Sequence, residues 1–298
     1  MGRAVGLVLG YAADRLLGDP SRWHPVAGFG RVAAALEACT YDDSRAAGVL
    51  HTLVLVGGSV ALGRVVPERT WPVALCTWAV LGGRSLAREA DAVHSRLSGG
   101  DLAAAREQVT HLVGRDPSTL GPDEIARATI ESVAENSSDA VVAPLLWGAV
   151  AGPAGLLGYR AVNTLDAMVG HRSAHYARFG WAAARLDDLV NLVPARVTAL
   201  LAAAARPRPA LAAWRRDAGR HPSPNAGPVE ASFAGALGLR LGGVNRYGDD
   251  VQDRGQLGSG RPPRPADIPR AVRLADGVGL GALTLAVLAA TAARRARR

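Results

Sequence analysis

Residues 131–166 read ESVAENSSDAVVAPLLWGAVAGPAGLLGYRAVNTLD, with an uncharged run from Ala140 to Tyr159 between two polar segments. The run approaches the ~17–25 residues that a helix needs to cross a bilayer, but Pro153 and the glycines beside it disfavour one continuous helix. Two arms that meet near Pro153 are each too short to span, which is typical of a re-entrant helical pair. We therefore expect a hairpin that turns near Pro153 and brings Asp139 opposite the region of Asp166, on one side of the membrane.

Three carboxylates lead into this run at a spacing of four residues: Glu131, Glu135 and Asp139. On a helix they lie on one face, where they repel each other unless a cation lies between them. A solvated acidic face is the alternative, but carboxylates beside an apolar segment are costly and usually functional. We expect all three to hold magnesium, because Mg²⁺ takes oxygen ligands from carboxylates together with the phosphates of ATP.

Further uncharged segments along the chain predict an all-α fold. We expect a multi-span helical membrane protein that forms one domain over residues 1–298, with glycine and alanine allowing close helix packing. The alternative is a soluble helical protein whose core helices are buried. The segments are Ala46–Gly63, Gly277–Ala293, the shorter Thr70–Gly83 and the arginine-interrupted Leu189–Ala205.

Two stretches between the apolar segments are polar, and we expect both to be cytoplasmic. Residues 84–139 should be helical, with helices over Arg84–Leu97 and Asp101–Val113, Asp101 as an N-cap, and a third helix from Pro122 to about Asn136. Residues 206–276 should be a loop region, because Arg206–Pro228 and Arg254–Pro269 are rich in Pro, Gly and Arg. No stretch of useful length alternates with period two, so no strand is expected.

The chain contains 34 basic residues, all of them arginine, and has a net charge of +8. Arginines lie beside apolar segments, at Arg206–Arg220 and in the tail from Arg294 to Arg298, which is the pattern that holds loops on the cytoplasmic side. No recognition helix, zinc finger or RNA-binding signature accompanies them, so nucleic acid is not expected as a partner. A lysine-bearing P-loop is excluded, because the chain has no lysine.

A series of motifs, in order along the chain, resembles the adenosylcobinamide-phosphate synthases, the CobD/CbiB family of cobalamin biosynthesis. The opening Gly18-Asp19-Pro20 with His24-Pro25-Val26 is similar to the start of that family, and Glu131-Ser132, Glu135-Asn136 and Asp139 are similar to its core. The resemblance covers the chain from about Tyr11 to Gly248. Its other pieces are Gly114-Arg115-Asp116, Asn163–Gly170, Arg185–Asp188, Ser223–Gly227 and Leu241–Gly248.

The resemblance implies an integral membrane enzyme that converts adenosylcobyric acid to adenosylcobinamide phosphate. Such an enzyme joins a corrin carboxylate to (R)-1-amino-2-propanol phosphate, or a related amino alcohol, in an amide (C–N) bond and uses ATP. We expect the corrinoid, the amino alcohol phosphate and membrane lipid as partners, with a complex of cobalamin-biosynthesis enzymes as a further one. We also expect a multi-pass protein of the bacterial inner membrane whose active site faces the cytoplasm.

In such a ligase the corrin carboxylate is first phosphorylated, and the amine then displaces phosphate from the acyl phosphate. We expect Glu135 and Asp166 to be catalytic, with Asp166 taking the proton from the ammonium nucleophile. Of the neighbouring Asp187 and Asp188, which point about 100° apart on a helix, at most one should face the site. Candidates for substrate and phosphate contact are Arg115, Asn136, Arg160, Asn163, Thr164, Arg172 and Asn225.

Two functions of other classes compete with this interpretation. Broken helices and polar residues near membrane depth also occur in small-solute transporters. Against a transporter, the sequence has no detectable inverted repeat, and its polar clusters lie at the ends of segments. A non-catalytic membrane scaffold for corrinoid enzymes is the third possibility, but it would not need so many acids and asparagines beside one apolar hairpin.

Overall fold

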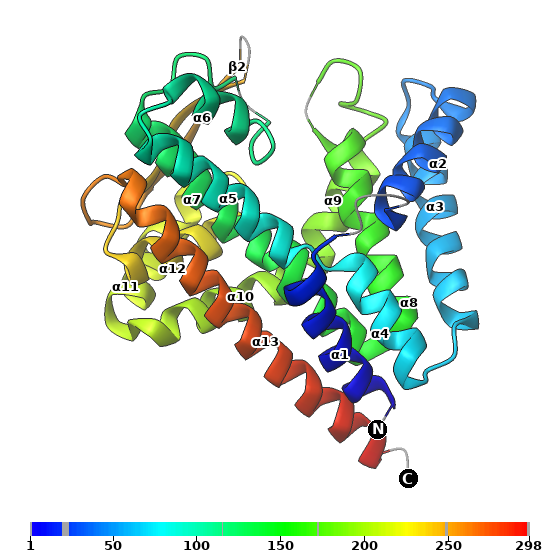
Figure 1. The fold of residues 1–298 in the computed structure, drawn as a ribbon. Helices are drawn as coiled ribbons and strands as arrows, with labels where there is room; N and C mark the ends of the chain where they lie inside the picture. The colour runs from blue at the N-terminus through cyan, green and yellow to red at the C-terminus, as the bar shows by residue number, and fades with distance from the viewer. Residues whose placement is uncertain (1, 20–23, 115, 172, 248–249, 297–298) are drawn as a thin grey trace. The chain divides into compact units, whose positions relative to one another are not determined.

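The computed structural model describes residues 2–19, 24–114, 116–171, 173–247 and 250–296. The described chain is predominantly helical, as the sequence predicted, and divides into two compact units where a single domain was expected. Unit 1 comprises residues 1–82, 143–191 and 283–298, and unit 2 comprises residues 83–142 and 192–282. Figure 1 colours the chain from its N-terminus in blue to its C-terminus in red.

Unit 1 is a bundle of long, mostly apolar helices. Helix α1 packs along α4, and α3 packs along α8, with α2 and α9 beside them (Figure 1). Part of its core is a cluster of buried side chains from five elements and the segment before α9, among them Leu55, Leu165 and Phe179. The elements are α1 (Gly2–Leu17), α2 (Pro25–Thr40), α3 (Arg45–Val65), α4 (Thr70–Val80), α8 (Ala143–Leu165), η2 (Asp166–Gly170), α9 (Trp181–Val190) and the end of α13 (Ile268–Ala296).

Small residues explain how closely these helices approach. A Cβ at Gly6 would lie 2.8 Å from the Thr70 carbonyl oxygen, and one at Gly63 would meet the backbone of Ala154. Helix pairs in membranes use such small residues to bring their backbones into contact, because lipid supplies no hydrophobic driving force between helices. The glycine and alanine content of the sequence therefore does serve helix packing in unit 1.

The apolar run that opens α8 reverses direction, as its sequence predicted. Gly152 has φ 61° and ψ −143°, a conformation outside the helical region, and Pro153 follows it. A Cβ at Gly155 would meet the carbonyl oxygen of Trp147, although eight residues of straight helix separate two positions by about 12 Å. The two arms of α8 therefore pack against each other as a hairpin, which confirms that part of the prediction.

Unit 2 surrounds helix α12, all of whose residues are buried. Helices α7, α10 and α11 pack against α12, and the two strands form an antiparallel hairpin beside it. The elements are α5 (Gly83–Ser98), α6 (Leu102–Val109), α7 (Pro122–Ser137), η1 (Ser138–Val142), α10 (Leu192–Ala205), α11 (Pro207–Asp217), η3 (Ala218–Arg220), α12 (Ala226–Leu237), β1 (Leu241–Tyr247), β2 (Asp250–Leu257), η4 (Pro265–Asp267) and the first part of α13.

The helices predicted between residues 84 and 139 are confirmed, with small differences at their ends. Asp101 caps α6 by accepting a hydrogen bond from the Ala104 amide at 3.0 Å. Pro122 starts α7, where a proline without an N–H costs no helical hydrogen bond. Helix α6 ends at Val109, short of the predicted Val113.

The prediction of a loop region over residues 206–276 is wrong. Pro207 and Pro209 occupy the first turn of α11, where proline is tolerated, so a Pro-rich stretch begins a helix. Strands β1 and β2 were not expected; they pair from Leu241 with Leu257 to Tyr247 with Asp250. Glycines at positive φ interrupt both strands, so the sequence shows no regular alternation of apolar and polar residues.

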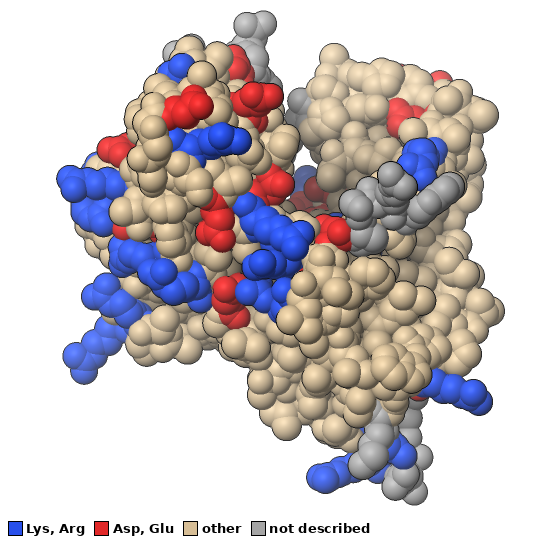
Figure 2. All heavy atoms as spheres, viewed as in Figure 1, with Lys and Arg blue, Asp and Glu red and all other residues tan. Residues whose placement is uncertain are grey.

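Three helical segments in the described part of the chain are long and apolar enough to cross a membrane: Arg45–Val65, Pro122–Gly170 and Pro265–Arg295. The bent pair α9 and α10 adds a fourth if it counts as one span. Helix α3 exposes a row of large apolar side chains, including Leu53 and Leu62, which a soluble surface rarely shows. In Figure 2 charged side chains gather over unit 2, while most of the visible surface over α2–α4 is uncharged. These features indicate a membrane protein.

Candidate functional site

Two groups of buried and half-buried polar side chains stand out, one in each unit. The aspartate cluster of unit 1 contains Tyr159, Asn163, Asp166, Asp187 and Asn191. The glutamate cluster of unit 2 contains Arg127, Glu131, Glu135, His221, Glu230 and Arg254. Each is built from elements that are distant in sequence.

The aspartate cluster is organised around the carboxylate of Asp187, which projects from α9. The Asn191 side chain donates to Asp187 Oδ2 at 3.0 Å and accepts at 2.9 Å from the Tyr159 hydroxyl of α8. The Asn163 amide, also from α8, donates a second hydrogen bond to Asp187. Asp187 is therefore oriented by neutral amide donors, which position a carboxylate without cancelling its charge.

Asp166 brings a second negative charge to the same place. It begins the π-helical turn η2, and its carboxylate lies directly over the backbone of Gly170. Its charge acts on Asp187, so the two carboxylates lie within electrostatic reach of each other. Within the described residues, Asp187 Oδ1 is buried and accepts no hydrogen bond. Two adjacent carboxylates in a partly buried setting favour a cationic ligand between them.

Three of the predicted contact residues lie next to this pair on α8. The Arg160 guanidinium donates to Asn163 Oδ1 at 3.4 Å, which links a positive charge to the aspartate cluster. The Thr164 hydroxyl donates to the Arg160 carbonyl at 2.7 Å, one turn earlier in its own helix. Such a bond satisfies the hydroxyl locally, so Thr164 contributes less to a binding site than Asn163 does.

The glutamate cluster pairs its carboxylates with arginine. Glu131 Oε1 accepts a 2.8 Å hydrogen bond from the Gly242 amide and lies 3.5 Å from the Arg127 guanidinium, which also donates to the Gly242 carbonyl. These contacts tie α7 to the start of β1. Glu135 lies half-buried one turn further along α7, where the opposite charges of Arg254 and Glu131 both act on it.

Glu230 lies at the centre of the buried helix α12 and is itself fully buried. Its Oε1 is 3.8 Å from the Arg254 guanidinium and 3.6 Å from His221 Nε2. Burial and the nearby Arg254 charge lower the pKa of His221 to about 4, so the imidazole is neutral at pH 7. His221 Nδ1 accepts from the Ser223 amide at 3.0 Å, which assigns the imidazole proton to Nε2, on the Glu230 side.

A small pocket of about 230 Å³ adjoins the Glu131 contacts in unit 2. Arg127, Arg240 and the backbone of Gly242 and Gly243 line it, together with two acids at the start of α7. Both glycines have positive φ, which lets the hairpin backbone turn at the pocket wall. The pocket has the size and donors for a small anionic group but is too small for a whole nucleotide.

The remaining predicted site residues have mainly local roles, or lie outside the described residues. Asn136 donates to Ser132 of its own helix at 3.0 Å, and Asn225 accepts from Arg196 at 2.9 Å. Asp139 is half-buried in the π-helical turn η1, a distortion that often occurs at functional sites. Asp139 belongs to unit 2 and Asp166 to unit 1, so their common site stays a prediction. Arg115 and Arg172 lie outside the described residues.

The predicted magnesium site of Glu131, Glu135 and Asp139 does not form from these side chains. In the part of the chain that is described, no three His, Cys, Asp or Glu side chains are grouped as metal ligands. Glu131 Oε1 is occupied by the Gly242 amide beside an arginine, which leaves this oxygen poorly suited to a cation. The three carboxylates therefore do not fit a shared ion as they lie, and a role for magnesium stays a prediction.

Several residues of the two clusters were missed or left open by the sequence. Nothing in the chain could show which of Asp187 and Asp188 faces inward, because that depends on the rotation of α9. Glu230 did carry a signal: it is the only acid in the apolar segment Ala226–Leu237, and a single carboxylate there is expensive. His221 and Arg254 reach Glu230 only through the fold of unit 2.

Comparisons with known proteins identify relatives over almost the whole chain. The family profile described as CobD/Cbib protein matches residues 7–275. A cobalamin biosynthesis protein CobD of Mycobacterium tuberculosis is 54% identical over 298 residues, covering 96% of this chain and 95% of the relative. CobD proteins of Chromobacterium violaceum and Rhodobacter capsulatus are 46% and 44% identical, each covering at least 92% of this chain and 93% of the relative. No solved structure matches the chain.

Proposed function

Since the chain belongs to the CobD/CbiB family of cobalamin biosynthesis proteins, we propose that it is a membrane-embedded amide ligase. The proposed reaction joins a carboxylate of adenosylcobyric acid to the amine of (R)-1-amino-2-propanol phosphate, or a closely related amino alcohol phosphate. The product is adenosylcobinamide phosphate, and ATP supplies the driving force.

The main support for this proposal is that the aspartate cluster combines two carboxylates with a nearby guanidinium group. An amino alcohol phosphate presents an ammonium at one end and a phosphate at the other. Asp166 and Asp187 offer two neighbouring carboxylates for the ammonium, and Arg160, linked through Asn163, offers a guanidinium for the phosphate. A site for a purely anionic ligand would not need two adjacent acids.

The chemistry runs in two steps that conserve atoms and charge. A corrin carboxylate oxygen attacks the γ-phosphorus of ATP, forming an acyl phosphate and releasing ADP. The amine nitrogen then attacks the acyl carbon, the C–O bond to phosphate breaks, and inorganic phosphate leaves. A carboxylate must take a proton from the ammonium before the nitrogen lone pair can attack.

Asp166 was the predicted base, and we assign Asp187 to the same step as its partner. Asp187 is oriented by Asn163 and Asn191, so its remaining oxygen has a defined direction toward a ligand. Asp166 then balances the ammonium charge while Asp187 holds or takes the proton. A role for magnesium beside the ATP phosphates stays a prediction.

We further propose the bacterial inner membrane as the location, with the aspartate cluster open to the cytoplasm. The arginines at the end of α13 favour the cytoplasmic side for the C-terminus, because positive charge beside an apolar segment is retained on that side. A tag fused to the C-terminus should react only with cytoplasmic reagents. Labelling of that tag by a reagent confined to the periplasm contradicts the orientation.

The function is tested with purified protein, ATP, adenosylcobyric acid and (R)-1-amino-2-propanol phosphate. We expect one equivalent each of ADP and phosphate per amide formed, with the product identified by its mass. Omitting ATP should abolish product, and 1-amino-2-propanol without its phosphate should react more slowly, because it lacks the group for Arg160. A protein that is folded and monodisperse but forms no amide with any of these amines would contradict the proposal.

A further inference from the structure

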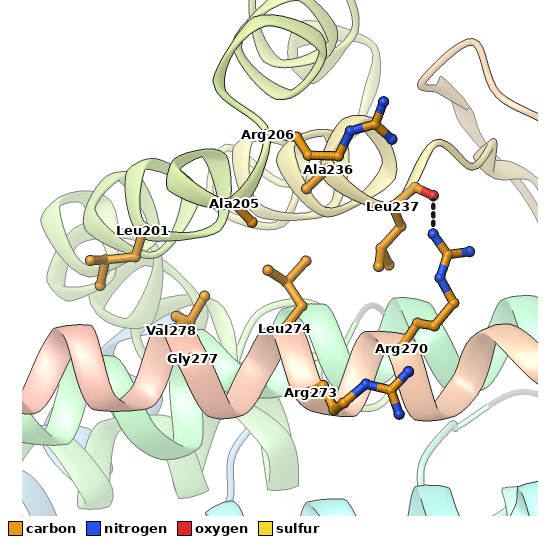
Figure 3. Close-up of a pocket in the computed structure, with 10 residues that line it drawn as sticks. All are labelled: Leu201, Ala205, Arg206, Ala236, Leu237, Arg270, Arg273, Leu274, Gly277 and Val278. Carbon is orange, nitrogen blue, oxygen red and sulfur yellow. Dashed lines mark hydrogen bonds between the residues drawn. The ribbon is translucent and has the colours of Figure 1, made fainter.

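A groove in unit 2 lies between the first part of α13 and the ends of α10 and α12, and no residue of either polar cluster lines it (Figure 3). Its volume of about 500 Å³ is that of a small-molecule site. Its apolar wall is formed by Leu201 of α10, Leu237 of α12, and Leu274 and Val278 of α13. Figure 3 shows these side chains projecting from facing helices into one space.

Three arginines line the same groove at one end: Arg206, Arg270 and Arg273. Arg270 has a fixed position, because it donates to the Leu237 carbonyl at 2.8 Å and to Asp267 at 2.6 Å. Asp267 is also bound by Arg261, so its charge is already matched. Arg206 and Arg273 are exposed, and among the described residues their side chains have no ion-pair or hydrogen-bond partner. The arginine end of the groove therefore carries uncompensated positive charge.

The order of these residues along α13 matches the order of chemical groups across a bilayer leaflet. Arg270 and Arg273 lie near the start of the candidate span Pro265–Arg295, and apolar residues follow from Leu274 onward. Leu280, 57% exposed, continues the apolar surface beyond the groove. A ligand that fits along this line needs a negative group at the membrane interface and a hydrocarbon chain toward the membrane interior.

We propose that this groove binds an anionic phospholipid. Its phosphate contacts Arg206 and Arg273 beside the fixed Arg270, and one acyl chain packs on Leu201, Leu274 and Val278. Basic pockets between membrane helices recognise lipid headgroups in this way, because guanidinium groups bind phosphate and lipid tails cover apolar walls. The proposal does not depend on the ligase activity, because it concerns a separate region of unit 2.

Two variants separate the parts of the lipid that bind. Arg206→Gln with Arg273→Gln removes the uncompensated charge, and Arg208→Gln with Arg215→Gln is the matched control, because both control arginines are exposed on α11 and do not line the groove. Gly277→Leu fills the apolar part: a Cβ at Gly277 meets nothing within 4 Å, so the new side chain occupies the groove without disturbing α13.

The purified full-length protein is placed in nanodiscs of phosphatidylcholine mixed with phosphatidylglycerol, and retained lipid is measured by native mass spectrometry after extraction into detergent. We expect retained phosphatidylglycerol in preference to phosphatidylcholine. The double arginine variant should bind it about 30-fold more weakly, since each arginine contributes about 1 kcal/mol at an anionic lipid. Gly277→Leu should also lose the lipid, and the control should keep it.

Each other outcome overturns the proposal in a defined way. Equal retention of the two lipids excludes recognition of the headgroup charge. Equal affinity for glycerol phosphate and phosphatidylglycerol indicates a plain phosphate site without an acyl chain. Loss of lipid in the Arg208 and Arg215 control indicates a diffuse effect of net charge, and full retention by Gly277→Leu indicates that the lipid binds elsewhere.

Discussion

The carboxylates of the two units have different kinds of neighbouring groups. In unit 1 the carboxylate of Asp187 is oriented by asparagine side chains, and its neighbour Asp166 adds charge of the same sign. In unit 2 Glu131 and Glu230 each lie beside an arginine. Neutral donors orient an acid and leave its charge for a ligand, whereas arginine neutralises it within the protein. We therefore expect the proposed chemistry in the aspartate cluster and a largely architectural role for the paired glutamates.

The largest expected effect is on turnover in unit 1. Asp187→Asn keeps an oxygen that can accept from Asn191 but removes the charge and the proton acceptor. We expect amide formation to fall about 10²–10⁴-fold, the usual contribution of a positioned general base. Turnover is measured under saturating substrates, with Asp43→Asn as the control because Asp43 is 58% exposed and paired only at the surface. Near-normal turnover in Asp187→Asn would remove the aspartate cluster from the mechanism.

In unit 2 we expect Glu230→Gln to lower the free energy of unfolding by about 3 kcal/mol, because it removes the buried carboxylate that lies 3.8 Å from the partly buried Arg254 guanidinium. The free energy of unfolding is measured by denaturant titration in detergent, and Glu107→Gln is the exposed control. Turnover per folded molecule should change much less than in Asp187→Asn. If Glu230→Gln is as stable as the parent but inactive, the paired glutamates of unit 2 do not have a mainly architectural role.

His221 should make the stability of the protein depend on pH. Its folded-state pKa of about 4 lies below the ordinary value of 6.5, so the unfolded chain binds the proton more readily. The contribution of a neutral His221 to the free energy of unfolding is complete above pH 6.5. It falls by about 3 kcal/mol as the pH falls toward 4.

His221→Asn keeps an acceptor for the Ser223 amide and cannot titrate in this range. Thermal unfolding of His221→Asn between pH 7 and pH 4 should lose less stability than the parent does. His111→Asn should behave like the parent, since His111 is 60% exposed. Parallel pH profiles for the parent and His221→Asn would show that a neutral imidazole is not required beside Glu230.

The smallest of these effects concerns the reversal of α8 in unit 1. Alanine at Gly152 must adopt φ 61° and ψ −143°, which costs an L residue about 1–3 kcal/mol. Gly57→Ala in α3 is the matched change, because a Cβ there meets nothing within 4 Å and alanine favours the helix. The midpoint of thermal unfolding should fall for Gly152→Ala and stay level or rise for Gly57→Ala. Equal midpoints would mean that the reversal does not need a glycine.

The sequence predicted features that depend on local rules. The N-cap of Asp101 and the helix start at Pro122 follow from backbone hydrogen bonding within a few residues. The turn next to Pro153 follows from the conformations that Gly and Pro allow. These signals lie within one segment, so no knowledge of the tertiary fold was needed to find them.

Features that depend on tertiary contacts were not predicted. Residues 207–217 look like a loop by composition, but proline in the first helical turn is harmless and α12 covers the apolar face of α11. The hairpin of β1 and β2 lacks alternation because its glycines serve close backbone approach. The aspartate cluster joins α8 to α9 through Asn191 and Tyr159, a connection that residue spacing alone does not contain.

A segment that enters and leaves the bilayer on one side adds nothing to the number of crossings. The reversal at Gly152 returns Leu165 to the side from which Ala143 departs, so α8 counts as zero in the topology although its hydropathy resembles that of a full span. A count that includes α8 as a crossing inverts the orientation of every later segment of the chain. Reporter fusions on either side of α8, after Val142 and after Gly170, should therefore report the same compartment.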